Sequence, residues 1–455
     1  MKKTFSALLI VAITFSLNAQ TIINRDPEIK KMVDEISKEK IEQHVRKLVS
    51  FHTRQNMSVQ NDPEKGIGAA WNWIKSEMET NIPVSQGRLT VGFEEYTVGG
   101  SGQRIPQETK LKNVVATLKG TDPTDDRIIM ISAHLDSRAA LDTDNTSFAP
   151  GANDDGSGVA AILELMRIMS VRRFSATIVF MTVSGEEHGL YGAKYMASKA
   201  RKENWNIIAM LNNDMIGNSG SSETLLNDNM RVRVFSEGVP ALETEQMTAL
   251  RKYTSGENDS KSRQLARYIK EVGERYVEQL NVTLIYRNDR FGRGGDHTPF
   301  CQEGFTAVRI TEFDENYDRT HKVPAMVNGI QEGDLPEYVD YEYVRKNAGI
   351  NLATIANLAL APFEPVNCGL SVGLSNKTTL IWESPSKGVK PAGYYILMRE
   401  TYQPVWEKKI YVTGNQVTLP YSKDNYFFGI QAVDAAGHES MAVFPGQVRR
   451  QSGTN

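Results

Sequence analysis

The chain has 455 residues and a nearly balanced charge, with 52 Lys and Arg against 55 Asp and Glu. This length predicts two or three domains, each large enough to bury a core. Nucleic-acid-binding proteins usually carry an excess of basic residues, so the composition argues against a nucleic-acid partner. With only two cysteines, the chain cannot build a disulfide framework or a cysteine-based zinc site. Any metal must therefore be held by His, Asp and Glu.

The first 20 residues have the features of a secretory signal. Two lysines precede an apolar run over residues 5–17, which is shorter than the roughly 20 residues that a membrane span needs. Small Ala19 suits a cleavage site, so we expect residues 1–19 to be removed and the protein to be secreted or periplasmic. An uncleaved anchor is the alternative. No later segment predicts a membrane span. Export would permit a disulfide between Cys301 and Cys368, although two unpaired thiols are the simpler expectation.

Strands and helices alternate along residues 20–361. Helical patterns cover residues 26–51 and a stretch that begins near Pro63. The predicted strands that follow are residues 114–118, 128–133, 176–183, 207–212, 232–235, 282–286 and 306–310. The predicted helices among and after them are residues 158–169, 191–200, 260–280 and 341–360. This alternation predicts an α/β domain with a mixed, largely parallel sheet covered by helices on both faces.

The pattern changes at residues 362–455. Pro362 and Pro365 end the last helix, and short strand-like runs separated by turn residues follow. Those runs are residues 378–382, 394–399, 409–412, 417–419 and 426–433. They predict a small all-β sandwich of about 90 residues, near the size of an immunoglobulin-like module. Residues 426–440, YFFGIQAVDAAGHES, resemble the late strands of a fibronectin type III domain.

This C-terminal module could contact a surface or a glycan. Five aromatic residues are available for an exposed patch: Trp382, Tyr394, Tyr395, Tyr402 and Trp406. For Trp382, which lies on an apolar strand, packing in the core is the expectation.

Five short segments place His, Asp and Glu close to predicted strand ends and turns. They are residues 133–136 (AHLD), 151–158 (GANDDGSG), 184–189 (SGEEHG), 212–217 (NNDMIG) and 294–300 (GGDHTPF). Each segment alone has an ordinary explanation, such as a helix cap for Asp154-Asp155 or a solvated pair for Glu186-Glu187. Ligands of open α/β sheets bind at the carboxyl ends of the strands, where several of these side chains would meet. Together they indicate a metal site.

The donor set also indicates which metal. Nitrogen and oxygen ligands without thiolate suit zinc and, less selectively, manganese or cobalt. Four carboxylates and two histidines exceed the needs of one tetrahedral ion. They suffice for two ions about 3.5–4 Å apart that share one carboxylate, with one acid left over for proton transfer.

The ordered motifs resemble those of the co-catalytic zinc aminopeptidases, a family that includes bacterial leucyl aminopeptidases, glutamate carboxypeptidase and glutaminyl cyclase. The resemblance covers about residues 39–360 and implies a three-layer zinc-exopeptidase fold with two Zn²⁺ per chain. It implies five metal ligands, with Asp154 shared by both ions, His134 and Asp214 on one ion, and Glu187 and His297 on the other. It also implies two further roles: Glu186 as general base, and Asp136 as acceptor of a hydrogen bond from His134.

The activity expected from this resemblance is that of an exported aminopeptidase that hydrolyses N-terminal residues from peptides. A carboxypeptidase or dipeptidase on the same scaffold is the main alternative, and it would need a cation for the substrate carboxylate, such as Arg287, Arg290 or Arg293. A one-zinc glutaminyl cyclase and a receptor-like relative without ligands are less favoured, because every expected ligand is present. The polar segment 219–257 could be a lid over the site or a solvated connection.

Overall fold

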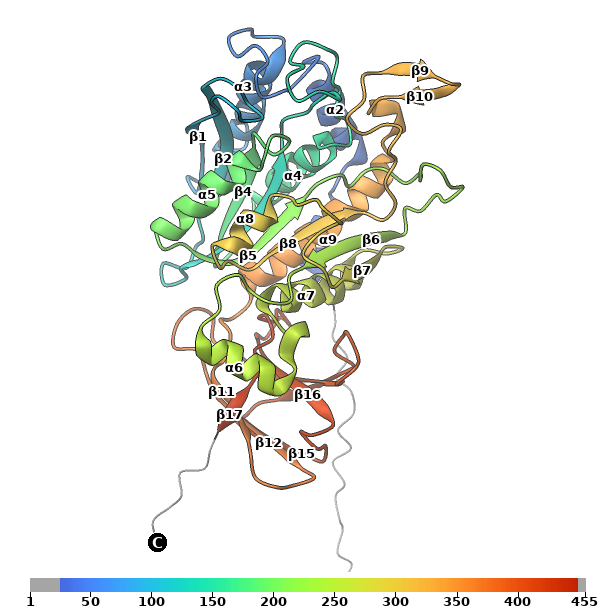
Figure 1. Cartoon of the computed structure of the whole chain (residues 1–455). Coiled ribbons are helices and arrows are strands. Elements are labelled where there is room, and N and C mark those ends of the chain that lie inside the picture. The colour runs from blue at the N-terminus through green and yellow to red at the C-terminus, as the bar shows by residue number, and fades with distance from the viewer. Residues whose placement is uncertain (1–24, 449–455) are drawn as a thin grey trace, which may run out of the picture.

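The computed structural model describes residues 25–448, so the predicted signal at residues 1–19 lies outside the described residues. The described chain forms an α/β part with a smaller all-β module beneath it (Figure 1). Within residues 25–448, no helix combines the length and the apolar character needed to cross a membrane. The predicted class, an α/β fold followed by a small all-β sandwich, is confirmed.

The α/β part is built on an eight-stranded sheet of order β1-β2-β4-β3-β5-β8-β6-β7. The strands are β1 (Leu89–Val98), β2 (Thr109–Leu118), β3 (Arg127–His134), β4 (Thr177–Val183), β5 (Asn206–Asn213), β6 (Arg231–Ser236), β7 (Asn281–Ile285) and β8 (Ala307–Glu312). The central strands β4, β3, β5 and β8 are parallel, whereas β2 and β6 join them in antiparallel fashion. The carboxyl ends of the four central strands therefore lie at one edge of the sheet.

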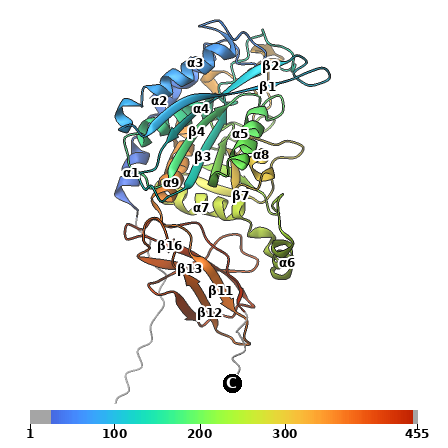
Figure 2. The same ribbon diagram turned by 90° about the vertical axis from the view of Figure 1, so that its left-hand side faces the viewer.

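Helices cover both faces of this sheet (Figure 2). One face carries α1 (Pro27–Asp34), α2 (Lys38–Val49), α3 (Gly66–Glu79), α4 (Gly156–Met169), α7 (Lys261–Tyr276) and α9 (Tyr341–Leu360). The other face carries α5 (Tyr191–Lys202) and α8 (His297–Gln302), which pack over a second, smaller core cluster. The single helical pattern expected over residues 26–51 is divided in two, because Ser37 caps the start of α2 by accepting a hydrogen bond from Lys40 N.

Three further elements lie on the periphery of the α/β part. Helix α6 (Glu245–Thr254) buries none of its side chains, and β9 (Ala325–Val327) pairs with β10 (Ile330–Glu332) as a hairpin after β8. Strand β1 was not predicted from the sequence. Only two of its ten residues are buried, and its two neighbouring acids weaken the apolar signal of a strand.

The C-terminal module consists of two sheets of order β15-β12-β11-β17 and β14-β13-β16. Its strands are β11 (Val366–Ser371), β12 (Thr378–Glu383), β13 (Gly393–Glu400), β14 (Lys408–Val412), β15 (Gln416–Leu419), β16 (Tyr426–Val433) and β17 (Gly446–Val448). One apolar core joins residues of both sheets, including Leu380, Ile396 and Phe428. Trp382, 3% exposed, lies in this core as expected.

The aromatic patch considered for this module is not formed. Of the five aromatic residues, only Tyr402 is exposed, while Tyr394 and Tyr395 are buried and Trp406 is partly buried. The two cysteines, Cys301 and Cys368, are both unpaired thiols.

The module is joined to the α/β part through a buried ion cluster. Glu439 is fully buried and pairs with Arg275 of α7 and with Lys409 of β14. Asn357 of α9 donates a hydrogen bond of 3.1 Å to the same carboxylate. A burial of this kind is tolerated because each charge has a partner. As Figures 1 and 2 show, the module packs against the end of the sheet that is opposite the carboxyl ends of the central strands.

Candidate metal centre

The carboxyl edge of the central sheet collects the predicted ligands. His134 is the last residue of β3, Glu187 lies in the turn after β4, and Asp214 directly follows β5. Asp154 comes from the turn before α4. Because parallel strands end together at this edge, four segments that are distant in sequence place their side chains in one crevice.

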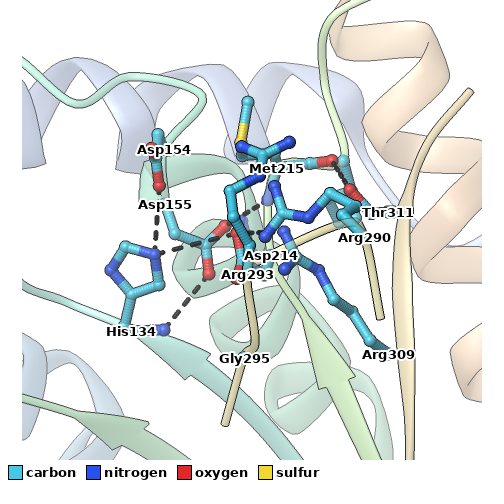
Figure 3. A network of polar contacts seen from close by, with 12 residues as sticks. His134, Asp154, Asp155, Asp214, Met215, Arg290, Arg293, Gly295, Arg309 and Thr311 are labelled. Carbon is cyan, nitrogen blue, oxygen red and sulfur yellow. Dashed lines mark hydrogen bonds and ion pairs between the residues drawn. The ribbon is translucent and has the colours of Figure 1, made fainter. Parts of the chain in front are cut away.

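Two groups of ligand atoms share Asp154. In the first group, Nε2 of His134 lies 3.0 Å from Oδ1 of Asp154 and 3.9 Å from Oδ1 of Asp214 (Figure 3). In the second group, Nε2 of His321 lies 3.0 Å from Oδ2 of Asp154 and 2.9 Å from Oε1 of Glu187. The ligand atoms of each group lie within 4.8 Å of one another. The structure thus brings together four of the five predicted ligands.

His297 is the predicted ligand that the structure does not bring to the cluster. It begins α8, is fully buried, and its Nε2 lies 2.8 Å from the carbonyl oxygen of Asn288. His321, in the loop after β8, takes the place in the second group that the sequence analysis gave to His297. His321 was not predicted from the sequence, because eight residues of loop separate it from the end of β8.

The role expected of Asp136 is also corrected. Nδ1 of His134 lies 3.0 Å from the backbone carbonyl oxygen of Asp136, whereas the nearest carboxylate oxygen is 3.8 Å away. A carbonyl can only accept, so His134 donates from Nδ1, and this hydrogen bond turns Nε2 toward the cluster. The orientation of the ring is therefore set as expected, but by the main chain of Asp136.

The carboxylate of Asp136 instead holds the turn that carries Glu186 and Glu187. It accepts the backbone N–H groups of Glu186 at 3.3 Å and Glu187 at 3.2 Å, and an N–H of Asn56 at 2.6 Å. Asp136 and Asn56 are both completely buried. These contacts fix the main chain from which both glutamates project into the crevice.

Two other buried acids, neither of them predicted as a site residue, position the Asp154 turn. Asp334 accepts the backbone N–H of Asp154 at 2.8 Å and that of Asn153 at 2.9 Å. Asp155 accepts the N–H groups of His134 and Met215 at 3.1 and 3.2 Å, so it ties β3 to the end of β5 (Figure 3). Satisfied buried carboxylates of this kind rigidify a site.

The electrostatics of the two groups favour bound cations. Although burial opposes protonation, Glu187 and Asp154 raise the pKa of His321 to about 10. In the same way Glu186 and Asp154 raise the pKa of His134, and hydrogen bonds from both histidines lower the pKa of Asp154 despite its burial. The acids thus stabilise positive charge at the position where a metal ion would bind. Two sets of N and O donors without thiolate fit zinc.

A cavity of about 260 Å³ opens above the two groups. Glu186, which belongs to neither group, lines this cavity, and burial raises the pKa of its carboxyl well above the usual range. Arginines 104, 138, 290 and 293 also line it. None of the residues 219–257 does, so that segment is not a lid over the cavity in this structure.

Comparison with known proteins agrees with this geometry. Residues 113–328 match peptidase family M28. A probable zinc metalloprotease of Leptosphaeria maculans is 42% identical over 422 residues, which make up 92% of this chain and 97% of that protein. This chain belongs to peptidase family M28. A probable zinc metalloprotease of Pyricularia oryzae is 41% identical and spans 92% of this chain and 84% of its own length.

Membership of family M28 makes the protein a zinc-dependent peptidase, which confirms the expected enzyme class and metal. Among solved structures, the aminopeptidase LapA of Legionella pneumophila has a TM-score of 0.52 and 19% identity, and the match covers 79% of this chain and 80% of LapA. This similarity shows the fold that the sequence motifs had implied.

Proposed function

We propose that this M28 peptidase is an exported two-zinc aminopeptidase that hydrolyses N-terminal residues from peptides. The observation that carries the proposal is the position of Asp154, whose two carboxylate oxygens each lie 3.0 Å from a different histidine. A carboxylate shared in this way is the arrangement that holds two ions close together. His134 and Asp214 would complete one site, and Glu187 and His321 the other.

Zinc held by these residues supplies the means to lower the pKa of a water molecule and to polarise the scissile carbonyl. Glu186 lines the cavity beside both groups without belonging to either. In the proposed reaction its carboxylate takes a proton from the attacking water and returns it to the amine nitrogen as the peptide bond breaks. Asp136, through the main chain of the turn, holds Glu186 in position for this transfer.

Two considerations favour an aminopeptidase over the alternatives. LapA of Legionella pneumophila, which shares this fold, is an aminopeptidase. The two ligand groups argue against a one-zinc glutaminyl cyclase and against a receptor-like relative without ligands. A carboxypeptidase or dipeptidase activity stays open, because arginines line the cavity.

The decisive experiment compares aminoacyl chromogenic substrates with their N-blocked equivalents. We expect cleavage of the substrates with a free amine only; cleavage of blocked substrates alone would refute the aminopeptidase proposal. Glu186→Gln should retain zinc, measured by elemental analysis, while its rate of substrate cleavage falls by about 10²–10⁴-fold. Glu64→Gln, an exposed residue, is the matched control. Loss of zinc from Glu186→Gln would show that Glu186 is a ligand.

Export is tested separately from activity. We propose that residues 1–19 are removed as a signal, so that the mature chain begins at Gln20. Mass spectrometry of the protein from a periplasmic or culture-medium fraction would show this N-terminus. Recovery of the intact N-terminus from a membrane fraction would instead support an uncleaved anchor.

A further inference from the structure

The wall of the cavity is rich in guanidinium groups. Arg104 comes from the loop between β1 and β2, Arg138 from the loop after β3, and Arg290 and Arg293 from the loop before α8. Arg290 and Arg293 line the cavity together with Asp214 and Met215 (Figure 3). Guanidinium groups bind carboxylates, so each of these arginines can pair with an acid of the protein or with a carboxylate of the substrate.

Two of these arginines are fully engaged with the protein. Arg138 donates to Glu187 at 3.0 Å and to Asp142 at 2.6 Å, and its Nη2 lies 2.9 Å from Nδ1 of His321. Arg290 contacts Asp289, Glu315 and the carbonyl oxygen of Gly294. Both side chains therefore serve to position protein groups around the metal centre.

Arg293 is different because most of its donors are unused. Nη2 of Arg293 donates to Oε2 of Glu315 at 2.7 Å, and within residues 25–448 neither Nε nor Nη1 makes a hydrogen bond. The side chain is 39% exposed and lines the cavity together with Asp214 and Gly294. A guanidinium has five N–H donors in a planar fork, so Arg293 can pair with Glu315 and still donate to a second carboxylate.

Arg104 repeats this arrangement beside the other ligand group. Its Nε and Nη2 donate to Asp142 at 2.7 Å each, and Nη1 makes no hydrogen bond within the described chain. The side chain is 44% exposed, and Glu187 and Glu186 are close enough to raise its pKa further. Arg104 is a weaker candidate than Arg293 for binding a second carboxylate, because Asp142 already occupies two of its donors.

We propose that Arg293 binds a carboxylate of the substrate next to the scissile bond, so that the enzyme prefers peptides with a carboxylate at that position. The inference rests on the proposed exopeptidase function and names its substrate class. The carboxylate could come from the side chain of an N-terminal Asp or Glu, or from the free C-terminus of a dipeptide. Arg287, the other arginine considered from the sequence, does not line the cavity and packs 3.8 Å from the ring centre of Phe291.

Two matched pairs of substrates separate these sources. The first pair has N-terminal Glu or Gln in an otherwise identical peptide with an amidated C-terminus. The second pair is a neutral dipeptide with a free or an amidated C-terminus. A charge-assisted hydrogen bond predicts about 10–100-fold higher kcat/KM for the acid member of one pair. Ratios near one in both pairs would overturn the inference.

Variants then test whether Arg293 is responsible. Arg293→Gln should reduce the acid-to-amide ratio toward one, and Arg293→Lys should restore part of it, because a lysine keeps the charge but not the fork. Arg287→Gln should keep the wild-type ratio. An unchanged ratio in Arg293→Gln would remove Arg293 from substrate recognition, whatever the preference of the wild-type enzyme.

A binding measurement distinguishes failure of this inference from failure of the proposed function. Calorimetry with the zinc-loaded enzyme compares L-glutamate with L-glutamine as probes. We expect tighter binding of L-glutamate by the wild type, and similar binding of the two by Arg293→Gln. If no exopeptidase substrate is cleaved but this difference is observed, the proposed function fails and the carboxylate site stands. Equal binding of the two probes by the wild type, together with ratios near one in both substrate pairs, would count against the carboxylate site itself.

Discussion

Oδ2 of Asp154 lies 3.0 Å from Nε2 of His321, although His321 belongs to an irregular loop beyond β8 and Asp154 to the turn before α4. The other carboxylate oxygen of Asp154 faces His134 at the end of β3. The loop after β8 is therefore part of the metal centre, and its conformation determines whether the second group of ligands is complete.

This relationship predicts different outcomes for two histidine substitutions. His321→Ala should lower the zinc content by one ion per chain and reduce activity by about 100-fold or more, because it removes a ligand of the second group. His297→Ala should retain zinc and lower the free energy of unfolding by about 2–5 kcal/mol, because it empties a fully buried site. Elemental analysis and chemical denaturation measure the two effects. The reverse pattern would reinstate His297 as the ligand.

The ligands that could be predicted from the sequence lie within four residues of a strand or helix. His134, Glu187 and Asp214 follow this rule, because the direction of a parallel strand determines where its next residues lie. The position of His321 depends on how a loop folds back across the site, and no periodic pattern in the sequence encodes that path. The same limit applies to Asp136. Its carbonyl oxygen and its nearest carboxylate oxygen differ by less than 1 Å in their distance from Nδ1 of His134.

Asp136 should affect activity through the turn that it holds. Asp136→Asn keeps the size of the side chain but removes the charge that accepts the N–H groups of Glu186 and Glu187. We expect zinc affinity or kcat/KM to fall about 10–100-fold, the range seen for groups that orient metal ligands. Zinc titration in a competing chelator and steady-state kinetics measure the change. Asp424→Asn on the exposed surface of the module is the control, and equal values for both variants would contradict the positioning role.

Glu439 should be important for the attachment of the module. Its pKa is lowered to about 2, because Lys409 and Arg275 more than offset the cost of burial. Glu439→Gln leaves these cations without their partner in a buried setting and should lower the free energy of unfolding by about 3–5 kcal/mol. Chemical denaturation followed by circular dichroism measures the loss, with exposed Glu407→Gln as control. A loss no larger than that of the control would mean that the junction does not depend on the ion cluster.

The stability of the junction should also depend on pH through His438. Nε2 of His438 lies 2.6 Å from Asp26, which caps α1, and Nδ1 lies 2.8 Å from Asp434 of the module. Carboxylates only accept, so both ring nitrogens donate and the imidazole is charged. Although burial opposes this charge, the hydrogen bonds to Asp434 and Asp26 raise the pKa of His438 above 6.5.

A raised folded-state pKa fixes the sign of the effect. The contribution of His438 is fully present below the unfolded pKa of 6.5 and is lost as pH rises through the higher folded value. We expect His438→Gln to be less stable than wild type by about 1.5–3 kcal/mol at pH 5.5, and this difference to shrink toward pH 9. Denaturation curves of both proteins at pH 5.5, 7 and 9 provide the test. A difference that stays constant or grows with pH would show that His438 is neutral in the folded protein.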